Sequence, residues 1–272
     1  MFIKLFMTLS IILPFTVFCQ PSEKKTTEEK ISDDIYLGVL KEDYLLGKFE
    51  RTKLDKFINK NEKDVHHLRP DTIAALNRMI EAYDLDRIQN NKNAQHIFIK
   101  SAFRSFYDQK SIWEDKFTGK RKMREDVTGK TPEQIIELIL EYSSAPGTSR
   151  HHWGTDMDLN ALQNDYFDPK GKGGYLYEWL QKNADKFGFC QPYNELEKRG
   201  NKGYKEERWH WSFAPIANHL KSDWEKLFND KKISFEKGKF LGSEILKNRP
   251  LLYVTSINES CKKAEEEFKK NK

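Results

Sequence analysis

Apolar residues recur with two different periods along the chain, and the two periods predict helices and strands in turn. After Pro70, apolar side chains return every three or four positions, as on one face of a helix: Ile73, Leu76, Met79, Ile80 and Tyr83. Pro70 suits the first helical turn, where its missing N–H leaves no partner unsatisfied. Over 95–103, Ile97 and Ile99 share one face, which predicts a strand.

The later part of the chain carries further start and stop signals. Thr131 is a favourable helix cap, Pro132 suits the first position, and Gln134 follows the cap by three residues. The other predicted elements are helices over 175–187 and 215–228, strands over 156–162 and 207–213, and a charged helix or disordered tail over 264–272. Because the strands are few and no βαβ repeat occurs, we expect an α+β fold.

The first 19 residues differ from the rest of the chain. They read MFIKLFMTLSIILPFTVFC, with one lysine ahead of an apolar run, which indicates a secretory signal peptide. Pro14 interrupts the run, which is short for a spanning helix of about 20 residues. We expect cleavage near Cys19 or Gln20; a lipid anchor at Cys19 is the alternative, although Phe18 is bulky for lipoprotein processing. The mature protein is then exported, periplasmic or envelope-associated, and has no transmembrane helix.

Charge is dispersed along the chain. The net charge is +5 and 33% of residues are charged, but lysines alternate with acids, so we expect no nucleic-acid partner. The length after the leader suits one core with appendages. We divide the chain into a signal peptide (1–19), a linker and N-terminal extension (20–68), a main domain (69–228) and a C-terminal extension (229–272). Within the N-terminal extension, 44–50 is interpreted as a pro-segment or a strap.

Three cysteines occur, Cys19, Cys190 and Cys261. If Cys19 leaves with the signal peptide, the other two remain in an oxidising compartment, where they form a disulfide or stay as two thiols. The sequence does not show whether their Cα atoms lie within bonding reach, so both alternatives stay open.

Two short segments carry the candidate metal chemistry. Residues 149–158 read SRHHWGTDMD, and residues 207–211 read ERWHW. A catalytic zinc ion needs three protein ligands of nitrogen or oxygen type and an open position for water. His151, Asp158 and His210 are candidates for those ligands.

Two further residues suit the chemistry that such an ion supports. Glu207 is a candidate general base for a water molecule, and Arg104 for contact with a developing oxyanion or a carboxylate. Residues three apart on a regular strand face opposite sides. Glu207 and His210 therefore address one ion only if a bend, a bulge or the start of the strand lies between them. We expect Glu207 at the mouth of the strand.

Taken together, these segments resemble the VanY-like D-alanyl-D-alanine carboxypeptidases, zinc peptidases that share a fold with the hedgehog signalling domain and lysostaphin-type enzymes. That family carries Ser-x-His-x-x-Gly-x-Ala-x-Asp and then Glu-x-Trp-His. The matching residues here are Ser149, His151, Gly154, Asp158, Glu207, Trp209 and His210. SAFRS at 101–105 is similar to the family's Ser-Gly-Tyr-Arg-Ser, with Gln109 where a glutamine is usual, and FGFCQPY at 187–193 also matches. The resemblance covers roughly 69–228.

The resemblance implies a fold, a set of roles and an activity. The fold is a small, mostly antiparallel sheet with flanking helices. The zinc ligands are His151, Asp158 and His210. Glu207 acts as general base and then acid, Arg104 holds the substrate and stabilises the tetrahedral intermediate, and Ser149 and Gln109 line the substrate pocket. The implied activity is D,D-carboxypeptidase hydrolysis of the terminal D-Ala-D-Ala bond of peptidoglycan stem peptides.

The same residue types leave other activities open. An L,D-carboxypeptidase, a D,D-dipeptidase or a cell-wall endopeptidase of the same family would use the same groups. A non-catalytic, zinc-containing wall-binding module is the alternative from another class, because a fold does not fix a function.

Two positions depart from the motif or compete within it. Asp156 stands where the family usually has alanine, and it shares a strand face with Asp158. It is interpreted as a partner of a ligand histidine, as an alternative ligand, or as a surface aspartate. His152 is the alternative to His151, which we prefer because it keeps the family spacing.

Overall fold

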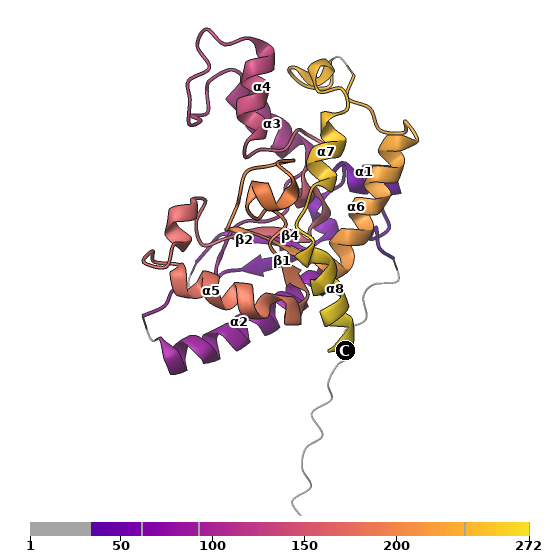
Figure 1. Cartoon of the computed structure of the whole chain (residues 1–272). Coiled ribbons are helices and arrows are strands. Elements are labelled where there is room, and N and C mark those ends of the chain that lie inside the picture. The colour runs from indigo at the N-terminus through magenta and orange to yellow at the C-terminus, as the bar shows by residue number, and fades with distance from the viewer. Residues whose placement is uncertain (1–33, 61, 92, 237, 272) are drawn as a thin grey trace, which may run out of the picture.

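Short antiparallel strands form the centre of the computed structural model, which describes residues 34–60, 62–91, 93–236 and 238–271 (Figure 1). A four-stranded sheet has the order β3-β4-β6-β5, and β1 pairs with β2 in a separate hairpin. The strands are β1 (Asp55–Ile58), β2 (Val65–Leu68), β3 (Ile99–Ser101), β4 (Asp156–Leu159), β5 (Phe189–Cys190) and β6 (His210–Phe213). Strands and helices in one domain with antiparallel pairing confirm the α+β prediction. The predicted signal peptide and Cys19 lie outside the described residues.

Helices surround this sheet. They are α1 (Lys41–Leu45), α2 (Pro70–Asn90), α3 (Phe106–Phe117), α4 (Pro132–Leu140), α5 (Gly174–Asn183), α6 (Ala214–Asn229), α7 (Arg249–Thr255) and α8 (Ser260–Lys270). The helices predicted from Pro70, Thr131 and 215–228 are confirmed. The helix predicted over 175–187 is α-helical to Asn183 and continues as a 3₁₀ helix over Ala184–Phe187. The predicted capping box forms, because Gln134 N donates to Thr131 Oγ1 and Thr131 N donates to Gln134 Oε1.

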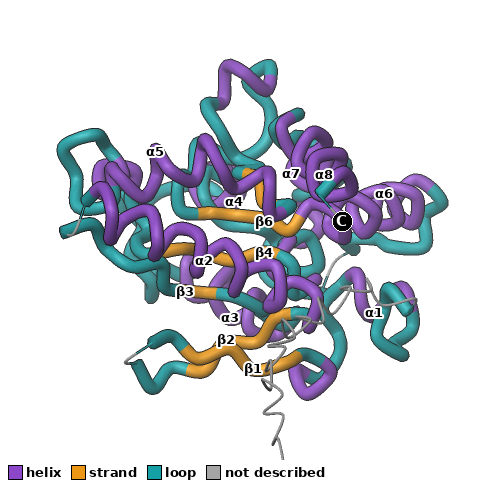
Figure 2. Tube along the Cα trace, turned by 90° about the horizontal axis from the view of Figure 1, so that it is seen from below, coloured by secondary structure: helices purple, strands orange, loops and turns teal. Residues whose placement is uncertain are grey.

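The sheet lies between two groups of helices. Helices α2 and α5 lie along one side of it, and α3 and α4 lie on the other (Figures 1 and 2). The main core buries Leu76 and Met79 of α2 against Met157 of β4 and Trp211 of β6. A second core joins α3 to α4. Burial of apolar side chains stabilises the packing of helices on both sides of the sheet. This packing holds the strands between the helices in fixed register.

The segments before and after the main domain pack against it. Tyr44, from the segment predicted as a pro-segment or strap, is fully buried and its hydroxyl donates to the Trp153 carbonyl at 2.7 Å. In the C-terminal extension, Phe240 belongs to the core between α3 and α4. Cys190 of β5 and Cys261 of α8 form a disulfide, which decides between the two alternatives left open by the sequence.

Some elements differ from the sequence-based predictions. The strands predicted over 95–103, 156–162 and 207–213 are each shorter in the structure. Strand β4 ends at Leu159 because Asn160 takes a left-handed conformation, with φ 59°. Helix α3 was not predicted, although Ser105 and Asp108 form a capping box at its start. Among the helices that the structure describes, none combines the length and apolar character needed to cross a membrane.

Candidate metal centre

Strand register brings two of the predicted ligands side by side. In the β4–β6 pair, Asp158 lies directly opposite His210, and on the other side of β4 Ser101 of β3 pairs with Asp158. Directly opposed residues on antiparallel strands have Cβ atoms only about 4.5–5.5 Å apart. Asp158 Oδ1 lies 3.4 Å from His210 Nδ1.

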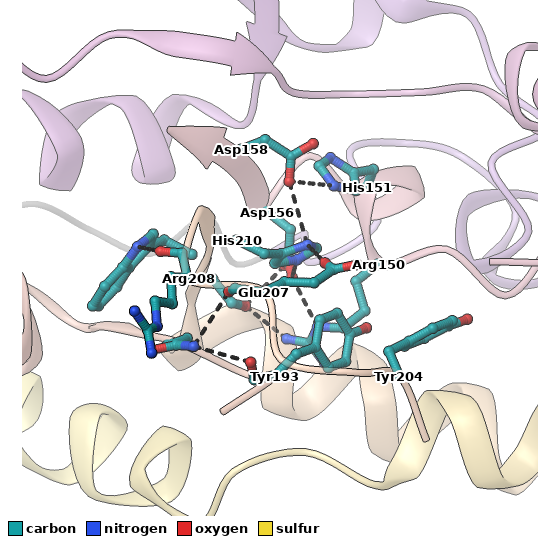
Figure 3. A network of polar contacts seen from close by, with 12 residues as sticks. Arg150, His151, Asp156, Asp158, Tyr193, Tyr204, Glu207, Arg208 and His210 are labelled. Carbon is teal, nitrogen blue, oxygen red and sulfur yellow. Dashed lines mark hydrogen bonds and ion pairs between the residues drawn. The ribbon is translucent and has the colours of Figure 1, made fainter. Parts of the chain in front are cut away.

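The third predicted ligand reaches the same point from a tight turn. His151 lies in the 3₁₀ helix Arg150–Trp153, which ends at Gly154 in a left-handed conformation, φ 69°. A Cβ at Gly154 would lie 2.9 Å from a Leu54 side-chain carbon, so glycine is required for both reasons. His151 Nε2 lies 3.4 Å from Asp158 Oδ1. One potential ligand atom each from His151, Asp158 and His210 lies within 4.8 Å of the others, with all three residues buried (Figure 3).

Hydrogen bonds fix which ring nitrogen of each histidine is available. His151 Nδ1–H donates to the Ala102 carbonyl at 2.8 Å, which leaves Nε2 buried and without a hydrogen-bond partner. His210 Nε2–H donates to Asp156 Oδ2 at 2.9 Å, which leaves Nδ1 facing Asp158 and Glu207. A ligand histidine in a metal site is oriented in this way, by donating its other N–H to an oxygen.

The charge distribution of this pocket favours a cation. Burial would raise the pKa of Asp158, but the adjacent His151 and His210 lower it to about 2. Burial would lower the pKa of His210, but its hydrogen bonds to Asp156 and Glu207 and the charge of Asp158 raise it to about 9. Three buried carboxylates thus surround one imidazole, and a positive charge among them is stabilised. The unpartnered ligand atoms and the excess negative charge of this pocket both fit a bound divalent cation.

Asp156 holds His210 and does not join the ligand group. Its Oδ2 also accepts from Arg150 Nε at 2.8 Å, and its Oδ1 accepts from Ser212 Oγ at 2.8 Å and Thr155 Oγ1 at 2.7 Å. Asp156 is fully buried, which excludes a surface aspartate. The geometry matches the interpretation of a partner that orients a ligand histidine. The buried Arg150 that balances its charge was not identified from the sequence, although it lies inside the motif.

His152 has a different environment from its neighbour His151. Its Nδ1–H donates to the Arg104 carbonyl at 2.6 Å, and its Nε2 accepts from Gly147 N at 3.0 Å. Burial lowers the pKa of His152 to about 3, so the ring is neutral. Both nitrogens are therefore engaged with the backbone, and His152 fixes the position of Arg104.

Glu207 lies in the turn immediately before β6, as expected. Its amide donates to the Tyr193 carbonyl at 2.9 Å, and its own carbonyl accepts from His210 N at 3.3 Å. This turn breaks the two-residue period, so the Glu207 carboxylate reaches 3.3 Å from His210 Nδ1. Burial raises the pKa of Glu207 above its ordinary value, against the opposing effect of His210. A raised pKa suits a group that both accepts and returns a proton.

A cavity of about 780 Å³ opens onto this centre, and Arg104, Asp158 and Glu207 are part of its lining. Arg104 Nε is buried and has no hydrogen-bond partner within the part of the chain that the structure describes. Ser149 and Gln109 are buried nearby in the fold but are not part of the cavity lining. Ser149 Oγ and Gln109 Oε1 find no hydrogen-bond partner among the described residues, whereas Gln109 Nε2 donates to the Ser144 carbonyl at 2.7 Å.

Known proteins match the part of the chain that contains this centre. The sequence model of the VanY family, described as D-alanyl-D-alanine carboxypeptidase, matches residues 65–216. A D-alanyl-D-alanine carboxypeptidase of Enterococcus faecalis is 26% identical over 139 residues, 51% of this chain and 48% of that protein. This chain therefore spans about half the length of that relative.

Solved structures are also similar. VanYB in complex with D-alanine-D-alanine is 21% identical, with a TM-score of 0.44, over 65% of this chain and 88% of that one. The LdcB LD-carboxypeptidase is 23% identical, with a TM-score of 0.41, over 64% of this chain and 72% of that one.

Proposed function

The chain belongs to the VanY family of D-alanyl-D-alanine carboxypeptidases, and from that premise we propose that it is a zinc-dependent D,D-carboxypeptidase. Its substrate is the terminal D-Ala-D-Ala bond of peptidoglycan stem peptides. The observation that carries the proposal is the convergence of His151, Asp158 and His210 beside Glu207, where Asp158 and Glu207 line a cavity.

Zinc is the ion that best fits these donors. Two imidazole nitrogens and one carboxylate oxygen, with a fourth position left open, are one of the donor sets found in catalytic zinc sites. When bound there, zinc supplies a Lewis acid that lowers the pKa of water to about 7 and polarises a carbonyl group. The ligand atoms are His151 Nε2, a carboxylate oxygen of Asp158 and His210 Nδ1.

The residues around the ion divide the remaining chemistry. Glu207 takes the proton of the attacking water and later delivers it to the leaving amine of the terminal D-Ala. Arg104, whose buried Nε has no hydrogen-bond partner among the described residues, stabilises negative charge that develops on the scissile carbonyl oxygen. Ser149 and Gln109 lie outside the lining of the cavity. Substrate contacts by either residue would therefore require its buried oxygen, which has no partner among the described residues, to become accessible.

Replacing Glu207 tests the proposed role. Glu207→Gln keeps the shape of the side chain but cannot accept a proton, so we expect turnover to fall by about 10²–10⁴-fold. Zinc content measured by elemental analysis should stay near one ion per chain, because Glu207 is not among the proposed ligands. Glu206→Gln is a matched control, because Glu206 instead pairs with Arg208 at 3.1 Å. Near-normal hydrolysis by Glu207→Gln would remove Glu207 from the mechanism.

Alternatives within the family differ in their products. An L,D-carboxypeptidase releases D-Ala from a tetrapeptide, a D,D-dipeptidase cleaves free D-Ala-D-Ala, and an endopeptidase cuts cross-links. Mass spectrometry of products from defined pentapeptide, tetrapeptide and dimeric substrates separates them. Release of D-Ala from the tetrapeptide alone would refute the D,D assignment.

A zinc-containing wall-binding module without catalysis is the alternative from another class. A purely structural zinc site has four protein ligands and needs neither a carboxylate base nor a cation in the pocket. Glu207 and Arg104 supply both here, which favours catalysis. Bound zinc together with no hydrolysis of any wall peptide would favour the binding module.

A cell-wall substrate requires export. We therefore propose that 1–19 is a secretory signal peptide, that a lipid anchor at Cys19 is the alternative, and that 69–228 is the peptidase domain between the extensions 20–68 and 229–272. Mass spectrometry of the N-terminus of the protein isolated from its own cells distinguishes cleavage, lipidation and an intact leader.

A further inference from the structure

The cavity wall carries more positive charge than the proposed chemistry uses. The basic residues of its lining are Arg104, Lys116, Arg121, Lys122 and Arg124. Arg104 serves the reacting carbonyl in the proposed mechanism. The other four come from the end of α3 and the loop that follows it, so they form one side of the cavity.

Most of these cations lack an acidic partner. None of Lys116, Arg121 and Lys122 forms an ion pair with a carboxylate of the residues described, and Arg124 instead lies over the Tyr142 ring, 4.6 Å from its centroid. Lys116 Nζ donates to Ser143 Oγ, which holds the ammonium group against the wall.

The acids of the same wall do not balance this charge. Glu125 pairs with Lys130 at 3.0 Å, and Glu141 pairs with Lys205 at 2.5 Å. Asp158 and Glu207 belong to the metal centre. Asp165 is left as the lining acid outside these pairs, so uncommitted cations outnumber it.

Lys116 is the most confined of the cations outside the metal centre. Burial, together with the positive charges of Arg121 and Arg104, lowers the pKa of Lys116 to about 8, while the negative charge of Glu207 opposes that change. A carboxylate placed beside this ammonium would offset the desolvation and the repulsion together. Lys116 in this position therefore binds an anion more favourably than a fully solvated lysine would.

The cavity is large enough to hold the part of the substrate that would carry this anion. Cavities of about 300–1,000 Å³ hold drug-sized ligands, and this one measures about 780 Å³. Residues on the acyl side of the scissile bond therefore fit inside it, together with their side chains.

We propose that Lys116, with Arg121 beside it, forms a subsite for a substrate carboxylate additional to the terminal one, carried by a side chain on the acyl side of the scissile bond. This inference rests on the proposed function and specifies its substrate class as acidic peptides. The subsite selects such peptides by a charge-assisted hydrogen bond from the Lys116 ammonium.

A pair of peptides that differ in one charge tests the subsite. Both end in D-Ala-D-Ala, and the residue before these is 2-aminopimelate with its side-chain carboxylate either free or converted to the isosteric amide. For the zinc-loaded protein we expect kcat/KM to favour the free carboxylate by about tenfold or more, mainly through KM. Calorimetric titration of the Glu207→Gln variant with each peptide measures the same preference as a ratio of Kd values, without turnover.

Variants assign the preference to Lys116. Lys116→Met should reduce the ratio between the two peptides to near one, and Lys116→Arg, which keeps the charge, should retain most of it. Lys110→Met is the matched control, because Lys110 lies on the same helix but pairs with Glu114 at 2.5 Å and is not part of the cavity lining. That control should keep the full preference.

The outcomes separate this inference from the proposed function. Hydrolysis of both peptides at equal rates, or a full preference that survives in Lys116→Met, would overturn the subsite and leave the carboxypeptidase assignment standing. Failure of the zinc-loaded protein to hydrolyse either peptide would overturn the proposed function, and the subsite with it.

Discussion

At the scale of single residues, the role of a side chain depends on the groups that it contacts. Asp156 and Asp158 are the same residue type on the same face of β4, and both are buried. Asp158 faces two histidine nitrogens at 3.4 Å. Asp156 instead receives hydrogen bonds from Arg150 and His210, so its lone pairs are occupied. Asp158 is therefore available to the proposed ion, while Asp156 orients the proposed ligand His210.

Neutralising Asp156 should weaken zinc binding without removing a ligand. Asp156→Asn keeps the size of the side chain but loses the charge that fixes the His210 ring, and such partners are worth about 10–100-fold in metal affinity. It also leaves Arg150 buried beside an uncharged group, so we expect lower stability as well. Competition with a chromogenic chelator measures the affinity. Asp168→Asn, on an exposed pair with Arg208, is the control, and equal zinc affinity in both variants would contradict the role of Asp156.

At the scale of elements, the segment around α1 supports the turn that carries the histidines. Trp153 Nε1 donates to the Leu45 carbonyl at 3.1 Å, and Phe106 N donates to the Gly47 carbonyl at 2.8 Å. Gly47 has φ +71°, and a Cβ there would lie 2.5 Å from His152 Nδ1. Of the two interpretations of 44–50, the strap is the one that these contacts support.

Substitution of Gly47 should therefore lower the free energy of unfolding by more than the strain of a left-handed backbone conformation alone. Gly129 is a matched control, because its φ is +75° but nothing lies within 4 Å of an added Cβ. A left-handed non-glycine residue costs about 1–2 kcal/mol, and we expect Gly47→Ala to exceed Gly129→Ala by at least about 1 kcal/mol in the free energy of unfolding, since His152 must move. Urea titration of both variants measures the difference. Equal losses would show that the strap adapts to the extra carbon.

At the scale of the whole molecule, the C-terminal extension is attached to the domain both covalently and by packing. The disulfide joins β5 to α8 across a sequence separation of 71 residues. Val254 and Phe268 are buried in the main core. The extension is therefore part of the folded unit that holds the sheet.

Removal of the disulfide should destabilise that unit. A closed loop of this length is worth about 4 kcal/mol in the chain-entropy model, and measured values are commonly about 2–5 kcal/mol. We expect Cys190→Ser with Cys261→Ser to lower the free energy of unfolding by this amount in urea. Reductant should destabilise the wild-type protein and leave the double variant unchanged. Identical unfolding curves for wild type and double variant under oxidising conditions would contradict the prediction.

From the amino-acid sequence alone, the α+β class, the principal helices and the candidate residues for metal chemistry could be predicted. These features are local: Thr131 and Gln134 cap a helix within one turn, and His151 and Asp158 lie seven residues apart in one segment. Residue type and local spacing can be read directly from the amino-acid sequence, so such patterns can be recognised there. The position of Glu207 before its strand was also predictable, because the two-residue period of a strand forbids the alternative.

Tertiary structure decided the features that depend on pairing between distant segments. The register of β4 against β6 sets Asp158 beside His210, and contacts with the Arg104 segment separate the roles of His151 and His152. Disulfide formation and the uncompensated charge of Lys116 likewise depend on which residues the fold brings together. Such contacts are set by the packing of the whole core, and no short stretch of sequence contains that information.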